Sequence, residues 1–141
     1  MGVDFYAYRE EDARHNASIE NLDYDEWEKV KKDEVAYIRE SYHGYTHAIS
    51  VFAPESYEHE KSEFGGYVYI PAAILRYRLP AVKKACLQRA KDAKGYGCVE
   101  GDEEASIKKY AEEHYALFEN VVKLAEEAEA EGKRILFYNS W

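Results

Sequence analysis

The chain has 141 residues and a formal charge of −9 at neutral pH. This length fits one domain over residues 1–141, with enough chain to bury a single hydrophobic core. The acidic balance argues against direct binding to nucleic acid or to an anionic membrane. The sequence has neither an apolar run of the ~20 residues that a membrane span needs nor a signal-peptide pattern, so we expect a cytoplasmic protein. Homo-oligomers stay open as an alternative to a monomer.

The first half of the chain contains one clear strand and several ambiguous segments. Residues 3–8 alternate and are rich in aromatic side chains, which predicts a strand. Residues 24–32 predict a helix that Asp23 can cap, and residues 35–39 fit either a short strand or a continuation of that helix. Residues 46–52 fit either a short helix or a strand. Loops are predicted where polar residues cluster, at residues 9–21 and 56–62.

The next segment predicts a strand followed by a helix. Residues 67–70 are aromatic and β-branched, and Pro71 suits the first turn of a helix whose apolar spacing continues to residue 93. Pro80 lies inside this pattern and is expected to kink the helix or to split it. Cys86 lies on the apolar side and is expected to be a small core residue rather than a reactive thiol.

The clearest element is a helix over residues 103–131, where apolar residues recur at intervals of three and four. Leu117 and Val121 lie on this stripe, so we expect both to be buried. His114 lies on the same stripe and is interpreted as a core histidine with a hydrogen-bond partner. Gly132 is expected to end the helix as its C-cap.

Together these elements predict an α/β domain, with α+β as the alternative. We expect a small mixed sheet covered by helices in two layers, with one long helix before the final strand. That strand is predicted over residues 134–138. It runs either parallel to the first strand, through a crossover, or antiparallel to it, and the strand order stays open.

The chain opens Met1-Gly2-Val3-Asp4-Phe5-Tyr6. This opening is similar to the Met-Gly-Leu-Asp-Met-Tyr that opens the chains of a group of small, mostly uncharacterised proteins of bacteriophages and prophages. Its members end in aromatic residues followed by Ser-Trp, similar to Phe137-Tyr138-Asn139-Ser140-Trp141 here. Gly66-Tyr67-Val68-Tyr69 resembles their glycine with paired tyrosines before a helix.

The fourth similar segment is Tyr37-Ile38-Arg39-Glu40. It resembles a Tyr-Trp-Arg-Lys segment of the phage and prophage proteins that has a histidine downstream. Here His43 and His47 follow, at a longer spacing from Arg39. The other departures from the group's pattern are Val3, Phe5, Ile38 and Glu40. The resemblance implies a phage or prophage accessory protein and does not imply an activity.

The densest functional-looking stretch begins at Tyr37 and carries tyrosines beside basic side chains. Two residues apart on a strand, Tyr37 and Arg39 share a face, as do Tyr67 and Tyr69. If those two strands pair, aromatic faces and a guanidinium line up as in nucleotide recognition, with a histidine closing one side. The candidate ligand-binding residues are Asp4, Tyr37, Arg39, His43, His47, Tyr67 and Tyr69. The competing interpretation is structural: aromatic strands pack on helices, and Asp4 pairs with Arg39.

Three functions follow as hypotheses. The leading one is a non-catalytic phage accessory protein that binds a small nucleotide-like anion or a host protein, in order to counter a host defence. The second is a small nucleotide-processing enzyme that uses Asp4, Arg39 and a histidine. The third is an acidic DNA mimic that inhibits a nucleic-acid-binding host protein. Its charge would come from the acidic runs at residues 10–12, 23–28, 101–104 and 126–131.

No catalytic or cofactor motif supports the enzyme hypothesis directly. The sequence contains no Walker loop, nucleophile elbow or dinucleotide fingerprint, and we expect no cofactor. His43 and His47 have the i,i+4 spacing of zinc-binding pairs, but no spacing points to a third ligand. A metal site is therefore not expected.

Overall fold

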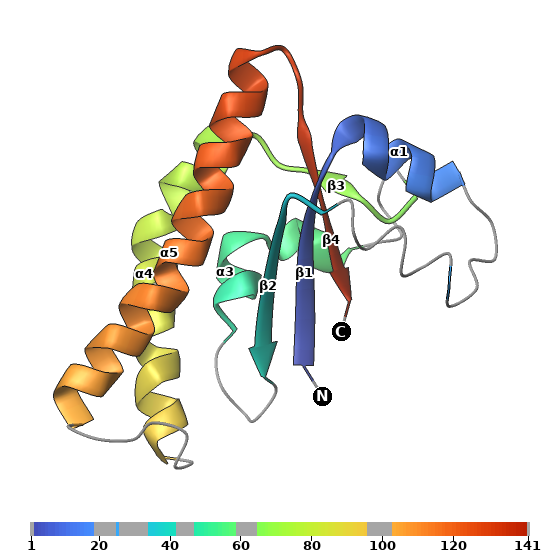
Figure 1. The fold of residues 1–141 in the computed structure, drawn as a ribbon. Coiled ribbons are helices and arrows are strands. Elements are labelled where there is room, and N and C mark those ends of the chain that lie inside the picture. The colour runs from blue at the N-terminus through green and yellow to red at the C-terminus, as the bar shows by residue number, and fades with distance from the viewer. Residues whose placement is uncertain are drawn as a thin grey trace.

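The computed structural model describes residues 2–18, 25, 34–41, 47–58, 65–95 and 103–140. Figure 1 shows the strands side by side in one sheet, with α4 and α5 forming a long hairpin beside it. In chain order the elements are β1 (Gly2–Arg9), α1 (Glu10–Ser18), β2 (Ala36–Ser41), α3 (Ala48–Phe52), the 3-10 helix η1 (Pro54–Tyr57), β3 (Val68–Tyr69), α4 (Ala72–Gly95), α5 (Glu103–Ala130) and β4 (Ile135–Ser140). The expected small sheet covered by helices, with a long helix before the final strand, is confirmed.

The sheet has the strand order β2-β1-β4-β3, and each neighbouring pair is antiparallel. The expected mixed sheet is therefore wrong, and the fold is α+β. The first residue of β4, Ile135, lies opposite Arg9 at the end of β1. The α4–α5 hairpin runs out along the sheet and back, so the chain re-enters beside the end of β1 and must run antiparallel to it.

The structure decides between the alternatives in the first half. Residues 36–41 form a strand and residues 48–52 a helix. The loop expected at residues 9–21 is wrong over residues 10–18, which form α1. Three acidic residues open this helix, and Glu10 accepts hydrogen bonds from Arg14, at 3.1 Å, and from Arg134. Apart from residue 25, the helix predicted over residues 24–32 lies outside the described residues.

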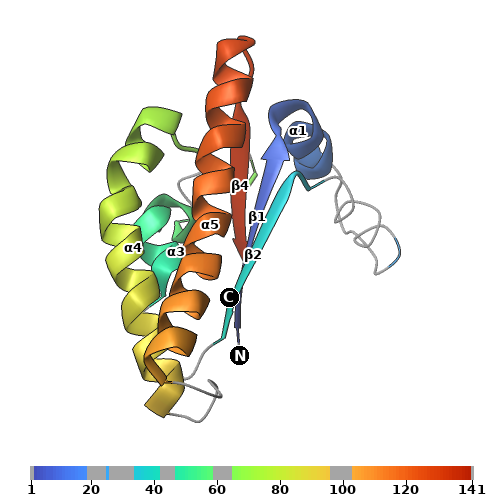
Figure 2. The same ribbon diagram turned by 60° about the vertical axis from the view of Figure 1, so that its left-hand side comes forward.

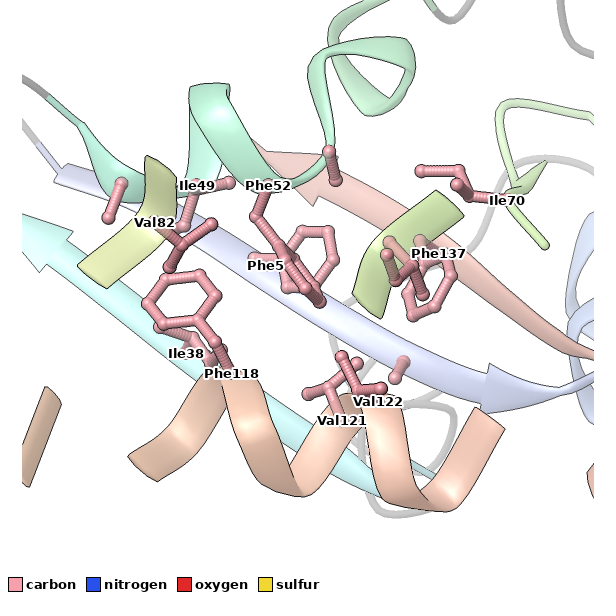
Figure 3. Close-up of a cluster of buried hydrophobic side chains, with 14 of the residues drawn as sticks. Phe5, Ile38, Ile49, Phe52, Ile70, Val82, Phe118, Val121, Val122 and Phe137 are labelled. Carbon is pink, nitrogen blue, oxygen red and sulfur yellow. The ribbon is translucent and has the colours of Figure 1, made fainter. Parts of the chain in front are cut away.

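The main core lies between one face of the sheet and helices α3, α4 and α5 (Figure 3). At its centre, Phe5 of β1 stacks on Phe137 of β4 at 5.4 Å and meets Phe52 of α3 edge-on at 6.1 Å. Phe118 of α5 meets the other side of Phe52 at 5.0 Å. Because side chains alternate along a strand, the residues of β1 next to Phe5 lie on the opposite face of the sheet.

The helix α5 buries a narrower stripe than the sequence predicts. Phe118 and Val121 are 0% and 1% exposed, whereas Leu117 is 43% exposed, so the expected burial is confirmed for Val121 and wrong for Leu117. Each residue turns the helix by about 100°, which rotates Leu117 away from the sheet when Phe118 points into it. Gly132, with φ of 72°, follows the helix as expected, and the next residue donates back to Ala128 at 2.8 Å.

The helix α4 continues through Pro80, so of the two outcomes predicted there, a kink or a split, the split is wrong. Leu79 and Val82, on either side of it, are both buried in the core. Pro80 itself is exposed, which leaves the carbonyl that lacks a backbone partner on the solvent side. Packing on both flanks therefore holds the helix together across the missing hydrogen bond.

Candidate functional site

Three of the candidate residues meet on the face of the sheet opposite α4 and α5. Asp4 of β1 lies directly opposite Arg39 of β2, and Tyr37 lies two residues from Arg39 on the same face. Arg39 Nη1 donates to the two Asp4 oxygens at 2.8 and 2.9 Å, and the Tyr37 hydroxyl donates to Asp4 Oδ1. The pairing of Asp4 with Arg39 and the shared face of Tyr37 and Arg39 are both confirmed.

This cluster is electrically compensated and partly open to solvent. Burial and the hydrogen bond to Asp4 raise the pKa of Tyr37, and the hydrogen bond to Asp4 raises the pKa of Arg39. At neutral pH the phenol is therefore neutral, and the guanidinium charge is offset by the Asp4 carboxylate. Tyr37 is 38% exposed and the Arg39 side chain 56% exposed. We call the exposed parts of these two side chains the Tyr37–Arg39 surface.

Behind this surface the sheet carries a network of tyrosine rings. Tyr6 is its centre, with ring centroids 5.1 Å from Tyr37, 6.1 Å from Tyr8 and 6.5 Å from Tyr138. Tyr67 extends the network, at 5.5 Å from Tyr8 and 5.2 Å from Tyr138. Burial, and then the charge of Asp4, raise the pKa of Tyr6 to about 12.

These rings form a second, smaller core rather than an open stacking platform. Tyr6, Tyr8 and Tyr67 are 4%, 0% and 5% exposed, and they pack with Ala13 of α1 and Leu136 of β4. Figure 2 shows α1 on the side of the sheet away from α4 and α5. A flat ligand therefore cannot stack on Tyr67 without displacing residues that already cover it.

Tyr67 and Tyr69 do not join Arg39. The strands β2 and β3 are the two opposite edges of the sheet, so the expected pairing of these strands is wrong. β4 returns from the helical hairpin and occupies the place beside β1, which leaves β3 only the outer edge of β4. Three strand spacings, about 14 Å, then separate β2 from β3. The Tyr69 hydroxyl instead donates to Glu129 Oε1 at 2.7 Å, and the Arg134 guanidinium lies 5.2 Å from its ring centre.

Of the two candidate histidines, the structure describes only His47. His43 lies outside the described residues, so its part in the site stays a prediction. His47 directly precedes α3, is half-buried, and its backbone carbonyl accepts a hydrogen bond from Ser50 Oγ at 2.6 Å. Within the described part of the chain, no group of three or more His, Cys, Asp or Glu side chains is placed to hold a metal ion.

A polar cluster inside the main core is the feature that sequence reasoning missed. Glu40 of β2 is 0% exposed, and its Oε1 accepts from the Ile49 backbone N–H at 2.8 Å. Its Oε2 accepts from the Ala48 N–H at 3.1 Å and lies 2.6 Å from His114 Nε2 and 3.2 Å from Arg89 Nε. Both carboxylate oxygens are thus fully engaged, which indicates a structural role.

The amino-acid sequence contained signals for two members of this cluster, His114 and Arg89, but not for their contact with Glu40. The interpretation of His114 as a core histidine with a partner is confirmed. Arg89 is 2% exposed and lies three residues after the buried Cys86, on the apolar side of α4, so helical spacing alone could have marked it. Cys86 is 0% exposed, which confirms it as a core residue, and burial, and then the charge of Glu40, raise its pKa to about 12.

Comparison of the chain with protein-family models, with curated proteins and with solved structures found no match. Among the helices of the described segments, none has both the length and the apolar character needed to cross a membrane.

Proposed function

We propose that this chain is a non-catalytic binding protein of phage or prophage origin, and that it recognises a host protein through the Tyr37–Arg39 surface. The observation that carries the proposal is the exposed, fixed pair of Tyr37 and Arg39, held by Asp4. Tyrosine and arginine are among the side chains that most often dominate the energy of protein interfaces. Hydrogen bonds that hold them before binding reduce the entropy lost when a partner docks.

A protein partner fits this surface better than a small anion does. Arg39 Nη1 already donates to both oxygens of Asp4, so the guanidinium charge is partly compensated before a phosphate or a carboxylate could bind. Tyr37 rests on the Tyr6 ring at 5.1 Å, which gives it a rigid base on the protein side and an exposed face on the other. A flat partner surface can cover both side chains at once.

The same geometry weighs against the enzyme alternative, in which Asp4 and Arg39 act with a histidine. A catalytic base must be able to reach a substrate proton with a free oxygen lone pair. Asp4 accepts hydrogen bonds from Arg39 and Tyr37 through the oxygens that a base would use. The resemblance of the opening and closing segments to phage proteins supports the origin, and a host protein is then the natural class of partner.

The experiment compares three immobilised proteins in bacterial lysate: the parent chain, Arg39→Ala and a matched control. Arg76→Ala is that control, because Arg76 is an equally exposed arginine (58% against 56%) that pairs with a carboxylate elsewhere, on α4. We expect a protein that binds the parent and Arg76→Ala but not Arg39→Ala. With that partner purified, Arg39→Ala should weaken binding by at least about 2 kcal/mol, or roughly thirtyfold.

Other outcomes point to other functions. Equal capture by all three proteins would overturn the Tyr37–Arg39 surface as the binding site. Capture of a nucleic-acid-binding protein that is lost in high salt and is indifferent to Arg39→Ala would favour the acidic DNA mimic. Selective binding of a nucleotide panel to the parent over Arg39→Ala, measured calorimetrically, would favour the small-anion function instead.

A further inference from the structure

The helical hairpin carries a groove that shares no residue with the Tyr37–Arg39 surface. Figures 1 and 2 show α4 and α5 side by side along their length. A groove between them has a volume of about 580 Å³, within the range of small-molecule pockets. Its apolar lining comes from Leu87 of α4 and from Ala111 and Tyr115 of α5. Leu87 is 40% exposed, so this lining is open to solvent.

The groove is basic although the chain as a whole is acidic. Three exposed lysines line it, Lys83 and Lys84 from α4 and Lys108 from α5, against one carboxylate, Glu112. In a chain with a net charge of −9, this is a local reversal of sign. Lys83 Nζ lies 5.7 Å from the centre of the Tyr115 ring, so this cation is held across the groove above an apolar surface.

We propose that this groove binds a small amphiphilic anion, an organic phosphate or carboxylate with an apolar body. The lysine ammonium groups would bind the head group as point charges, while the apolar body lies against Leu87 and Tyr115. This site is independent of the proposed function, because it shares no residue with the Tyr37–Arg39 surface.

The size and ends of the groove favour a small molecule over a docked helix. Arg76 of α4 and Glu126 of α5 form a two-contact ion pair, at 2.8 and 2.5 Å, that bridges the same two helices nearer the start of α4. A partner helix lying along the hairpin would meet this bridge after about two turns, whereas a small anion fits beside it. The charge of the rim excludes cationic ligands by repulsion.

The test is calorimetric titration of the full chain with decyl phosphate and with decanoate, both below their micelle concentrations. We expect saturable one-to-one binding that weakens as salt is added. Decyl phosphate binding alone identifies a phosphate site, decanoate binding alone a carboxylate site, and either result supports the proposal. Decyltrimethylammonium, with the same tail and the opposite charge, should not bind. Equal binding of the cationic probe, or no binding of either anion, overturns the proposal.

Two variants separate the groove from the rest of the surface. Lys83→Glu with Lys84→Glu should weaken binding of the anions by at least about tenfold. Lys91→Glu with Lys123→Glu changes the net charge equally, at exposed positions of the same two helices outside the groove lining, and should leave binding within about twofold. An equal effect of both double variants would overturn the proposal.

A third variant tests the apolar part. Leu87→Asn removes apolar lining without changing charge, at a position exposed enough to keep the fold. We expect it to weaken decyl phosphate more than the short-chain ethyl phosphate. If sedimentation showed instead a dimer that Lys83→Glu with Lys84→Glu dissociates, the groove would be a self-association surface and the proposal would fail.

Discussion

Replacing Glu40 by glutamine tests whether the buried polar cluster holds the helices to the sheet. Glutamine keeps the shape of the side chain and one acceptor oxygen but replaces the other oxygen with an NH₂ donor. Both oxygens of Glu40 face donors: Ile49 N–H on one side, and Ala48 N–H with His114 and Arg89 on the other. In either orientation of the amide, at least one buried donor therefore loses its acceptor.

The larger part of the effect comes from charge. Arg89 is 2% exposed, and the Glu40 carboxylate, 3.2 Å from its Nε, is a compensating charge beside it. Removing one member of a buried ion pair typically costs about 3–5 kcal/mol, since the remaining charge stays buried. The buried donor that loses its acceptor would by itself cost about 1–3 kcal/mol. This cost is already part of the cost of breaking the ion pair, so the two are not added. We expect Glu40→Gln to destabilise by about 3–5 kcal/mol, a large share of the ~5–15 kcal/mol of a small domain.

The assay is urea unfolding followed by far-ultraviolet circular dichroism, with Glu126→Gln as the control. Glu126 also pairs with an arginine, but the Arg76 and Glu126 side chains are 58% and 41% exposed, so that change should cost under about 1 kcal/mol. Adding Arg89→Met to Glu40→Gln removes the uncompensated charge and should restore part of the stability. A Glu40→Gln protein within about 1 kcal/mol of the parent, or a double variant less stable than Glu40→Gln alone, would refute the reasoning.

Two further predictions concern stability. Phe118→Ala should cost about 3–5 kcal/mol and the neighbouring Leu117→Ala under about 1 kcal/mol in the same urea assay, because only Phe118 is buried; equal costs would contradict the orientation of α5. The hydrogen bonds from Arg78 lower the pKa of Glu55 below its usual 4.5, so the stability that this ion pair gives is present above pH 4.5 and is lost as pH falls through the lowered folded-state value. Glu55→Gln should therefore flatten the loss of stability between neutral and acidic pH, and an unchanged pH profile would contradict it.

Local pattern was sufficient for the long elements and insufficient for their pairing. The stripe on α5 and the aromatic alternation of β1 each repeat over many residues, so the sequence predicted both. The strand order depends on where the α4–α5 hairpin returns the chain, and no local pattern encodes that. The predicted split at Pro80 is wrong for a similar reason, because tertiary packing of Leu79 and Val82 outweighs the local cost of proline.

In the candidate site, too, the sequence predicted the contact that depends on local pattern and not those that depend on the strand order. Asp4 and Arg39 could be paired from the sequence because a charged residue inside an apolar strand needs a partner, and the register provides it. Tyr67 and Tyr69 were grouped with Arg39 on the assumption that their two strands pair, and the sheet places two other strands between them. The Glu40 cluster also takes Arg89 of α4 and His114 of α5, which are far from Glu40 in the chain, so its members could not be assembled from spacing.

The strand β2 links the two polar clusters and explains why neither can move independently. Its alternation sends Tyr37 and Arg39 to one face of the sheet and Ile38 and Glu40 to the other. A slip of one residue would bury Arg39 in the main core and expose Glu40, so both polar groups penalise the wrong register. Glu40 further fixes β2 against α3 through two backbone N–H groups. The buried carboxylate therefore sets the position of the strand that presents the Tyr37–Arg39 surface.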